Sequence, residues 1–325
     1  MKIFITGING FVGSYLVEYL IKSYPKSKIY GLIRNRADQH NLLQIKSKLK
    51  LIEADLLDTK KIDQTIKSVK PDWVFHLAAQ MSSRFMKEAD EQMLDINIIG
   101  ALNLLKAVKN NAPKAKFLFI SSAAVYGNPP GHCFPLKESC PAAPIDIYGS
   151  SKVCAEILCQ QYCKIFGLPV LIARTFNILA PTRAQNYLEK NFIPQIKSIK
   201  FCKAPPIINT GDLTSERDFL DIRDIIRAYV ALIQRGRPGE IYNVCSGTAR
   251  RMDPLSGLLI KYSGLKGKVK LVRDRRYVRA IDIKKSVGSN VKLKRHTGWS
   301  PKIKLERTLS DMLKHQGLLC NKTSK

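Results

Sequence analysis

Gly7-Ile8-Asn9-Gly10-Phe11-Val12-Gly13 is the stretch that decides the fold. The apolar run from Lys2 to Thr6 predicts a buried strand before it, and residues Ser14 to Ser23 predict a helix after it. Gly7 allows a tight turn, Gly10 lets the backbone approach a pyrophosphate, and Gly13 lets the helix pack closely on the strand. The free N–H groups at a helix start favour anions. We therefore expect a dinucleotide here, contacted by Gly7, Asn9, Gly10, Phe11, Val12 and Gly13.

Strand-like and helix-like segments alternate up to about residue 177, which predicts an α/β fold with a doubly wound parallel (Rossmann) sheet. Beyond residue 178 the segments become shorter, and we expect a smaller C-terminal α/β substrate lobe. The predicted division is a dinucleotide-binding domain over 1–177 and a substrate lobe over 178–325, with segments from about 210–245 returning to the sheet. The further expected strands are Lys28 to Ile33, Leu49 to Ala54, Asp72 to Leu77, Phe117 to Ile120, Leu168 to Ala173 and Glu240 to Val244.

The second strand ends at Arg34-Asn35-Arg36, where an NAD-selective site usually has an acid that binds the adenosine ribose. Arginine suits a ribose 2′-phosphate instead. We predict that NADP(H) is preferred and that NAD(H) is possible. The alternative is that both arginines are ordinary surface charges.

The ends of the next strands supply the other expected ligand contacts. Asp55 and Leu56 follow the third strand and are placed to meet the adenine ring. His76 lies within an apolar strand, so we expect a structural histidine. The remaining expected cofactor contacts are Leu77, Ala78, Ala79, Asn97, Ser121 and Phe176, with Asn97 as a backbone anchor, and the loop residues expected to face substrate are Gln80, Ser82, Ser83 and Arg84.

Tyr148 and Lys152 are four residues apart, so a helix places both on one face. A phenol titrates near ~10, and a neighbouring ammonium is expected to lower its pKa toward the working range. Ser122, at the end of the strand from Phe117, can hold a substrate oxygen while Tyr148 gives it a proton. Tyr148 and Lys152 would also contact the cofactor. A Tyr-x-x-x-Lys pair alone is a weak signal, and its weight comes from this context.

The chain carries 54 Lys and Arg against 26 Asp and Glu, a formal charge of +28. This excess suits an anionic ligand, and it could also suit nucleic acid or an anionic membrane surface. The basic residues are spread singly, so we prefer a solvated basic surface and an anionic substrate to nucleic-acid binding. No apolar run approaches ~18 residues, so no membrane span is expected. Eight cysteines without metal-ligand spacing and the lack of a leader favour the reducing cytoplasm and no metal site.

Together these segments resemble the extended short-chain dehydrogenase/reductases that act on nucleotide-diphospho-sugars. The resemblance covers almost the whole chain and is carried by the glycine turn, Asp55-Leu56, His76-Leu77-Ala78-Ala79, Ser122, Val125-Tyr126-Gly127, Tyr148 to Lys152 and Arg174-Thr175-Phe176-Asn177. The C-terminal half is most similar to GDP-6-deoxy-D-mannose reductases. That likeness rests on Arg217-Asp218-Phe219, Asp221 to Asp224, Tyr242 to Gly247, Arg279 to Asp282, Gly288 to Asn290 and Thr297 to Pro301.

The resemblance implies a GDP-sugar substrate, with Asn177, Arg217, Arg279 and Asp282 among its contacts. Guanidinium groups match the geometry of a diphosphate, although Arg217 and Arg279 could also be surface residues. It further implies a homodimer that pairs the helices at about 87–111 and 148–166. Ala180, where such enzymes commonly have glycine, departs from the pattern.

The family includes several reactions, and the residues after Ser122 separate them. Related dehydratases have acids or bases where Ala123 and Ala124 stand, and GDP-fucose synthases have a cysteine and a histidine where Ala123 and Asn191 stand. Alanine cannot transfer protons, so we expect 4-keto reduction of GDP-4-keto-6-deoxy-D-mannose by NADPH to GDP-D-rhamnose. The main alternative is a 4-epimerase that holds NAD tightly; a sugar-nucleotide 4,6-dehydratase and a non-catalytic nucleotide- or nucleic-acid-binding protein are less favoured.

Overall fold

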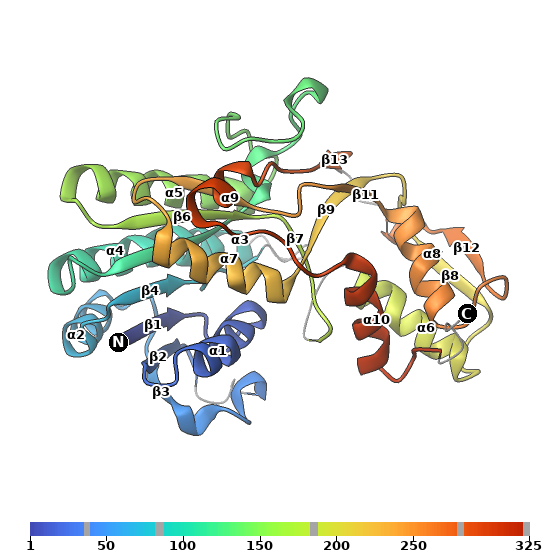
Figure 1. The fold of residues 1–325 in the computed structure, drawn as a ribbon, viewed down its shortest axis with the longest axis horizontal. Helices are drawn as coiled ribbons and strands as arrows, with labels where there is room; N and C mark the ends of the chain where they lie inside the picture. Colours follow the sequence, from blue (N-terminus) through green and yellow to red (C-terminus); the bar gives the residue numbers. More distant parts are fainter. Residues whose placement is uncertain (36–39, 82–87, 183–187, 278–282, 321–325) are drawn as a thin grey trace.

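A parallel sheet of seven strands forms the centre of the protein, which we describe from a computed structural model over residues 1–35, 40–81, 88–182, 188–277 and 283–320. Each strand pairs with its neighbours in parallel (Figure 1). The predicted doubly wound sheet is confirmed. Across the sheet the strands lie in the order β10 (Ile241–Val244), β6 (Val170–Thr175), β5 (Lys116–Ser122), β4 (Trp73–His76), β1 (Lys2–Thr6), β2 (Lys28–Ile33) and β3 (Leu49–Glu53).

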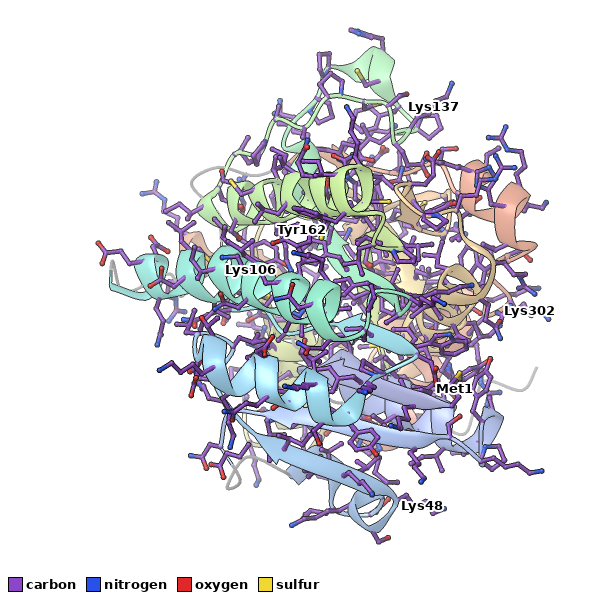
Figure 2. All side chains as sticks on the ribbon, turned by 90° about the vertical axis from the view of Figure 1, so that its left-hand side faces the viewer. Met1, Lys48, Lys106, Lys137, Tyr162 and Lys302 are labelled. Atoms are coloured by element: carbon purple, nitrogen blue, oxygen red, sulfur yellow. The ribbon has the colours of Figure 1, made fainter. Side chains whose placement is uncertain are left out.

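Helices cover both faces of this sheet, because the strands are apolar on both sides. On one face, α1 (Phe11–Ser23) and α7 (Ile222–Arg235) bury their apolar stripes against the strands. On the other face, α2 (Thr59–Val69), α4 (Gly100–Asn111) and α5 (Ile147–Phe166) do the same. Figure 2 shows these three helices one above another, with Lys106 on α4 and Tyr162 on α5.

Helix α1 begins at Phe11, three residues before the predicted start at Ser14. Gly10 is its N-cap and has extended backbone angles, φ −71° and ψ 173°. The first free N–H groups of the helix therefore belong to the glycine stretch itself. This brings the positive end of the helix dipole directly to the predicted phosphate site.

The helical segment predicted at about 87–111 contains a π-helical turn. Helix α3 (Glu88–Leu94) leads into the π turn Asp95–Ile99 and then into α4. A π turn adds a residue to the helix and is often found at functional sites. Here it carries the buried Asn97.

The C-terminal part has smaller sheets and its own apolar core. One small sheet consists of β9 (Glu216–Asp221), β11 (Ala249–Arg251), β13 (Lys285–Ser286) and β7 (Asn177–Leu179). The other pairs β8 (Ile207–Thr210) with β12 (Lys270–Arg273). The helices of this part are α6 (Ile193–Lys200), α8 (Met252–Tyr262), α9 (Val291–Thr297) and α10 (Leu305–His315).

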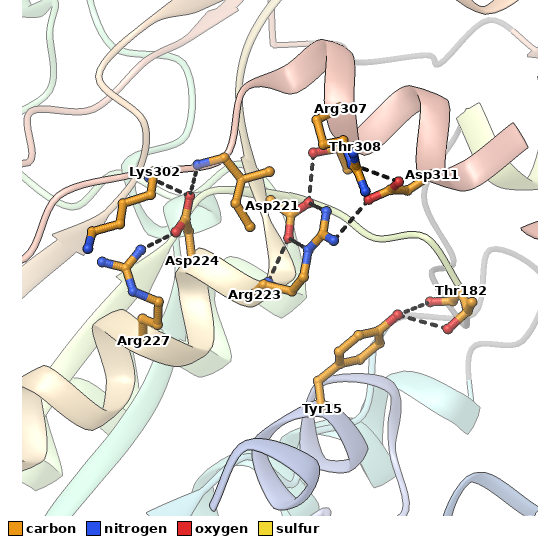
Figure 3. A network of polar contacts seen from close by, with 11 residues as sticks. Tyr15, Thr182, Asp221, Arg223, Asp224, Arg227, Lys302, Arg307, Thr308 and Asp311 are labelled. Atoms are coloured by element: carbon orange, nitrogen blue, oxygen red, sulfur yellow. Dashed lines mark hydrogen bonds and ion pairs between the residues drawn. The ribbon is translucent and has the colours of Figure 1, made fainter. Parts of the chain in front are cut away.

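Polar contacts fix this C-terminal part to the sheet side of the molecule (Figure 3). Asp221 caps α7 and also accepts a hydrogen bond of 2.7 Å from the Thr308 hydroxyl of α10. Asp224 accepts from the backbone N–H groups of Lys302 and Ile303, both at 2.8 Å. The start of α7 therefore determines where α10 and the segment before it lie.

Among the helices of the described residues, none has both the length and the apolar character needed to cross a membrane.

Candidate active site

The glycine turn has the shape of a phosphate cradle. Gly7 has a positive φ of +69°, and a Cβ on it would lie 2.8 Å from the backbone nitrogen of Ala78. A Cβ on Gly13 would lie 2.2 Å from the Gly7 carbonyl oxygen, so the helix packs on the turn as well as on the strand. Both glycines are therefore required by close backbone packing, which brings the turn and the start of α1 together at the predicted phosphate site.

A cleft of about 600 Å³ extends from this turn along the carboxyl ends of β1, β2, β3 and β4. Most of its lining was predicted to contact the cofactor: Gly7, Asn9, Gly10, Arg34, Asn35, Asp55, Leu56, Leu77, Ala78 and Ala79. Gln80, predicted to face substrate, also lies in this cleft. Leu32, Ala54, Gln92 and Ile96 line it without having been predicted. An elongated cleft that ends in a glycine cradle fits a dinucleotide.

Asn97 acts as an anchor for the cleft wall. Its side-chain oxygen accepts from the Gln80 backbone N–H at 2.8 Å, and its nitrogen donates to the Gln80 carbonyl at 2.9 Å and to the Ser151 hydroxyl at 2.9 Å. These bonds engage both ends of the amide. Asn97 therefore holds the Gln80 backbone in place and ties it to α5, as its predicted anchoring role requires.

The structure brings Ser122, Tyr148 and Lys152 together. Ser122 ends β5, and its hydroxyl accepts from the Ala124 backbone N–H at 3.1 Å. Tyr148 lies in the first turn of α5 and shares a hydrogen bond with the Ser122 side chain. One turn later, Lys152 Nζ donates to the Ile120 carbonyl at 2.9 Å and lies 5.8 Å from the centre of the Tyr148 ring.

The predicted lowering of the Tyr148 pKa by Lys152 is wrong for this structure. Burial raises the pKa of Tyr148 to about 12, and the hydrogen bond from Ser122 opposes this only in part. Burial also lowers the pKa of Lys152, to about 8. Both shifts have the same cause, because low-dielectric surroundings penalise a phenolate and an ammonium alike. At neutral pH the Tyr148 phenol is therefore protonated and can act as a proton donor.

Beneath these residues lies a buried ion pair that the sequence analysis missed. Glu156 follows Lys152 by one helical turn, and its carboxylate receives two N–H groups of Arg174 and the hydroxyl of Ser121. Ser121 was predicted to contact the cofactor, but its hydroxyl is engaged with Glu156. Helix α5 is thereby joined to β5 and β6 immediately next to Ser122.

A chain of buried contacts leads from Arg174 through Tyr126 and Asn243. The Arg174 guanidinium lies 4.7 Å from the centre of the Tyr126 ring, and the Tyr126 hydroxyl donates to Asn243 Oδ1 at 2.7 Å. The Asn243 backbone N–H in turn donates to Glu138 at 2.9 Å. The loop between Ser122 and Tyr148 is thus held to β6 and β10.

The residues predicted to contact substrate lie in different parts of the structure. Asn177 is half-buried and donates to the Asp218 carbonyl at 3.2 Å. Arg217 is half-buried on β9, between β11 and β13. Phe176, predicted to meet the cofactor, is buried against Tyr126 with its ring over Gly288, which is a packing position. Arg36, Ser82, Ser83, Arg84, Arg279 and Asp282 lie outside the described residues.

His76 is buried in the sheet, as expected for a structural residue. Its Nδ1 shares a hydrogen bond of 2.7 Å with the Thr6 hydroxyl, and Nε2 has no hydrogen-bond partner among the described residues. Burial lowers the pKa of His76 to about 3, with a smaller contribution from the Lys152 charge. The ring is therefore neutral and pins β4 to β1.

Comparison with known proteins agrees with this geometry. The profile of the GDP-mannose 4,6 dehydratase family matches residues 4–312. GDP-6-deoxy-D-mannose reductase of Pseudomonas aeruginosa is 31% identical, over 96% of this chain and 96% of that protein. The chain belongs to the extended short-chain dehydrogenase/reductase family.

Solved structures of this family place the chain among NAD(P)-dependent sugar-nucleotide enzymes. The structure of RMD from Pseudomonas aeruginosa complexed with NADPH is 30% identical with a TM-score of 0.82, covering 97% of this chain and 96% of that one. UDP-glucose 4-epimerase of Thermotoga maritima with UDP-glucose is 26% identical with a TM-score of 0.85, covering 98% and 99%. Members of one family thus catalyse different reactions on this fold.

Proposed function

We propose that this short-chain dehydrogenase/reductase reduces GDP-4-keto-6-deoxy-D-mannose at C4 with NADPH, giving GDP-D-rhamnose. The observation that carries the proposal is the placement of the Tyr148 side chain against Ser122 at the carboxyl end of β5, with Lys152 one helical turn further along α5. Bound NADPH would supply the hydride. We place the sugar between the sheet and the C-terminal part over 178–325, with Arg217 as a diphosphate contact.

The proposed roles follow from the side-chain chemistry. Ser122 holds the C4 carbonyl oxygen by a hydrogen bond and positions it next to Tyr148. Tyr148 donates its proton to that oxygen as the negative charge develops, and Lys152 contacts the nicotinamide ribose and lies beside the phenol. Ketone reduction needs the neutral phenol, which a pKa of about 12 provides. Oxidation of a C4 hydroxyl would instead need the phenolate.

Dehydration is disfavoured by the short helix that follows Ser122. Ala123 and Ala124 start this 3₁₀ helix (Ala123–Tyr126) and are only half-buried. A 4,6-dehydratase must remove one proton and donate another at adjacent carbons. Neither alanine can do so.

The 4-epimerase is the second candidate, favoured by the TM-score of 0.85 to UDP-glucose 4-epimerase. One experiment separates the two. The purified enzyme is mixed with NADPH and freshly made GDP-4-keto-6-deoxy-D-mannose, and the product sugar is identified. We expect stoichiometric NADPH oxidation and GDP-D-rhamnose. NAD that remains bound through purification, together with UDP-hexose interconversion without added reductant, would contradict the proposal.

Tyr148→Phe is the matched control for this assay. It removes one hydroxyl while the ring remains, and we expect turnover to fall by about 10²–10⁴-fold. NADPH binding, followed by fluorescence titration, should change little. A variant with a near-normal rate would reject the role of Tyr148.

The proposed NADPH preference rests on Arg34 in the cleft wall at the end of β2. Its guanidinium can pair with a 2′-phosphate, which NADH lacks. We expect Arg34→Gln to weaken NADPH binding and to leave NADH binding nearly unchanged. Tighter NADH than NADPH binding in the parent enzyme would refute the preference.

We also propose a homodimer built through α4 and α5. Four isoleucines are exposed along this helix layer: Ile99 by 44%, Ile147 by 42%, Ile157 by 51% and Ile165 by 64%. Association of two copies would remove them from water. Light scattering that shows only monomer at micromolar concentration would contradict this assembly.

A further inference from the structure

The end of the molecule farthest from the seven-stranded sheet is built from segments rich in lysine. Helix α6, strands β8 and β12 and helix α8 lie together there (Figure 1). The segments that build it, 190–211 and 254–273, contain no aspartate or glutamate. Besides Lys190, their exposed lysines are Lys197, Lys203, Lys261, Lys266, Lys268 and Lys270.

Neutralisation of the other six lysines by neighbouring acids is not seen in the part of the chain that the structure describes. The described part of the chain offers the six lysines no ion pair. Ion pairs of this region form at its borders, between Arg251 and Asp253 and between Arg276 and Asp274. The lining of the cofactor cleft includes none of the six, so the dinucleotide does not explain them.

Large apolar side chains are exposed among these lysines. Phe201, directly after α6, is 55% exposed, and Ile207 on β8 and Leu271 on β12 are 40% and 42% exposed. Ile207 is paired in register with Lys270, so an apolar and a cationic side chain lie next to each other. All three belong to segments without aspartate or glutamate; Ile207 shares its side of the strand pair with Lys270, and Leu271 lies on the other side with Ile208.

We propose that this surface, defined as residues 197–207 and 261–271, docks the enzyme onto an anionic lipid bilayer. Lysines near a negatively charged leaflet are attracted to its surface potential, and neighbouring aromatic and aliphatic side chains can enter the interfacial region. Phe201 is the one large aromatic side chain exposed in these described segments, whereas single-strand nucleic-acid surfaces stack successive bases on several aromatics, so we favour lipid over nucleic acid. The phosphate-binding turn lies elsewhere and stays free for the cofactor.

Vesicle flotation tests this inference with the full-length enzyme. Vesicles of phosphatidylcholine alone are compared with vesicles that also contain phosphatidylglycerol, at low and at physiological salt. We expect binding to the anionic vesicles alone, weakened by salt. The variant Lys266→Gln/Lys268→Gln/Lys270→Gln should bind at least about tenfold more weakly. Phe201→Ser should weaken binding without changing its salt dependence.

The matched control is Lys22→Gln/Lys26→Gln/Lys28→Gln, which removes the same charge from exposed lysines at the end of α1 and the start of β2. It should bind vesicles as the parent does, and both triple variants should keep the parent rate of NADPH oxidation. Equal weakening by the two triple variants would show a general charge effect and overturn the proposal. So would failure to bind anionic vesicles at low salt, or lysine-dependent binding to single-stranded RNA without vesicle binding.

Discussion

Glu156 on α5 and Arg174 on β6 form an ion pair that is almost entirely shielded from water. Arg174 Nη2 lies 2.7 Å from Glu156 Oε2, and 6% and 4% of the two side chains are exposed. The pair joins the helix that carries Tyr148 and Lys152 to the strand next to Ser121 and Ser122. It therefore determines how the proposed proton donor faces the serine.

Glu156→Gln should strongly destabilise the protein. Glutamine keeps the size of the side chain but leaves the Arg174 charge buried without a counter-charge, which costs about 3–5 kcal/mol. Urea denaturation measures this loss. Arg251→Gln, which breaks the exposed pair with Asp253, is the control and should change the free energy of unfolding by less than about 1 kcal/mol. A loss of similar size in both variants would contradict the buried-pair account.

Lys152→Met should abolish turnover and yet increase stability at pH 7. The folded-state pKa of Lys152 is about 8, below its ordinary value of 10.5. Between these values the unfolded chain binds more protons, so the parent gains stability as pH rises through this window. The variant lacks this gain. The difference in free energy of unfolding by which it exceeds the parent should therefore shrink by about 3 kcal/mol toward pH 10.5. Urea denaturation at pH 7 and pH 10 measures this difference, with exposed Lys106→Met as the control. A difference between Lys152→Met and the parent that stays the same at both pH values would refute the prediction.

His76 should make the fold sensitive to acid. Its folded-state pKa of about 3 lies below the ordinary 6.5, so its contribution is present above pH 6.5 and is lost as pH falls toward 3. In His76→Phe this loss should disappear. The fall in free energy of unfolding between pH 7 and pH 4 should be about 3 kcal/mol smaller than in the parent. The same fall in both proteins, or an equal change in exposed His132→Phe, would show another origin.

Two helical glycines should respond oppositely to alanine. In Gly13→Ala the new methyl would meet the Gly7 carbonyl oxygen at 2.2 Å, so the turn must move. We expect loss of both NADPH affinity and stability. Gly257 lies inside α8 with nothing within 4 Å of its Cβ position, so Gly257→Ala should stabilise by about 0.5–1 kcal/mol. Calorimetric NADPH titration and thermal melts measure both effects, and unchanged affinity in Gly13→Ala would exclude Gly13 from the cradle.

The local patterns made much of the site predictable. The glycine turn, the apolar strands and the spacing of Tyr148 and Lys152 depend on neighbours in the chain, and most of the predicted cofactor contacts lie in one cleft. The Glu156–Arg174 pair was not predictable in this way, because it depends on the register that places Ser121 opposite Arg174. The Tyr148 pKa depends on burial, which spacing does not reveal. The π turn was not predictable either, because its residues have the same sequence pattern as the helix around it.

Strand β10 has a consequence for how the protein is made. Its residues, Ile241–Val244, complete the sheet beside β6, whose six residues are all buried. A chain that has emerged from the ribosome only as far as residue 177 would leave β6 as an unpaired apolar edge, which is prone to intermolecular pairing. The seventh strand can pair with β6 only after residue 244 has been synthesised. Truncation after the first six strands should therefore yield a fragment that aggregates.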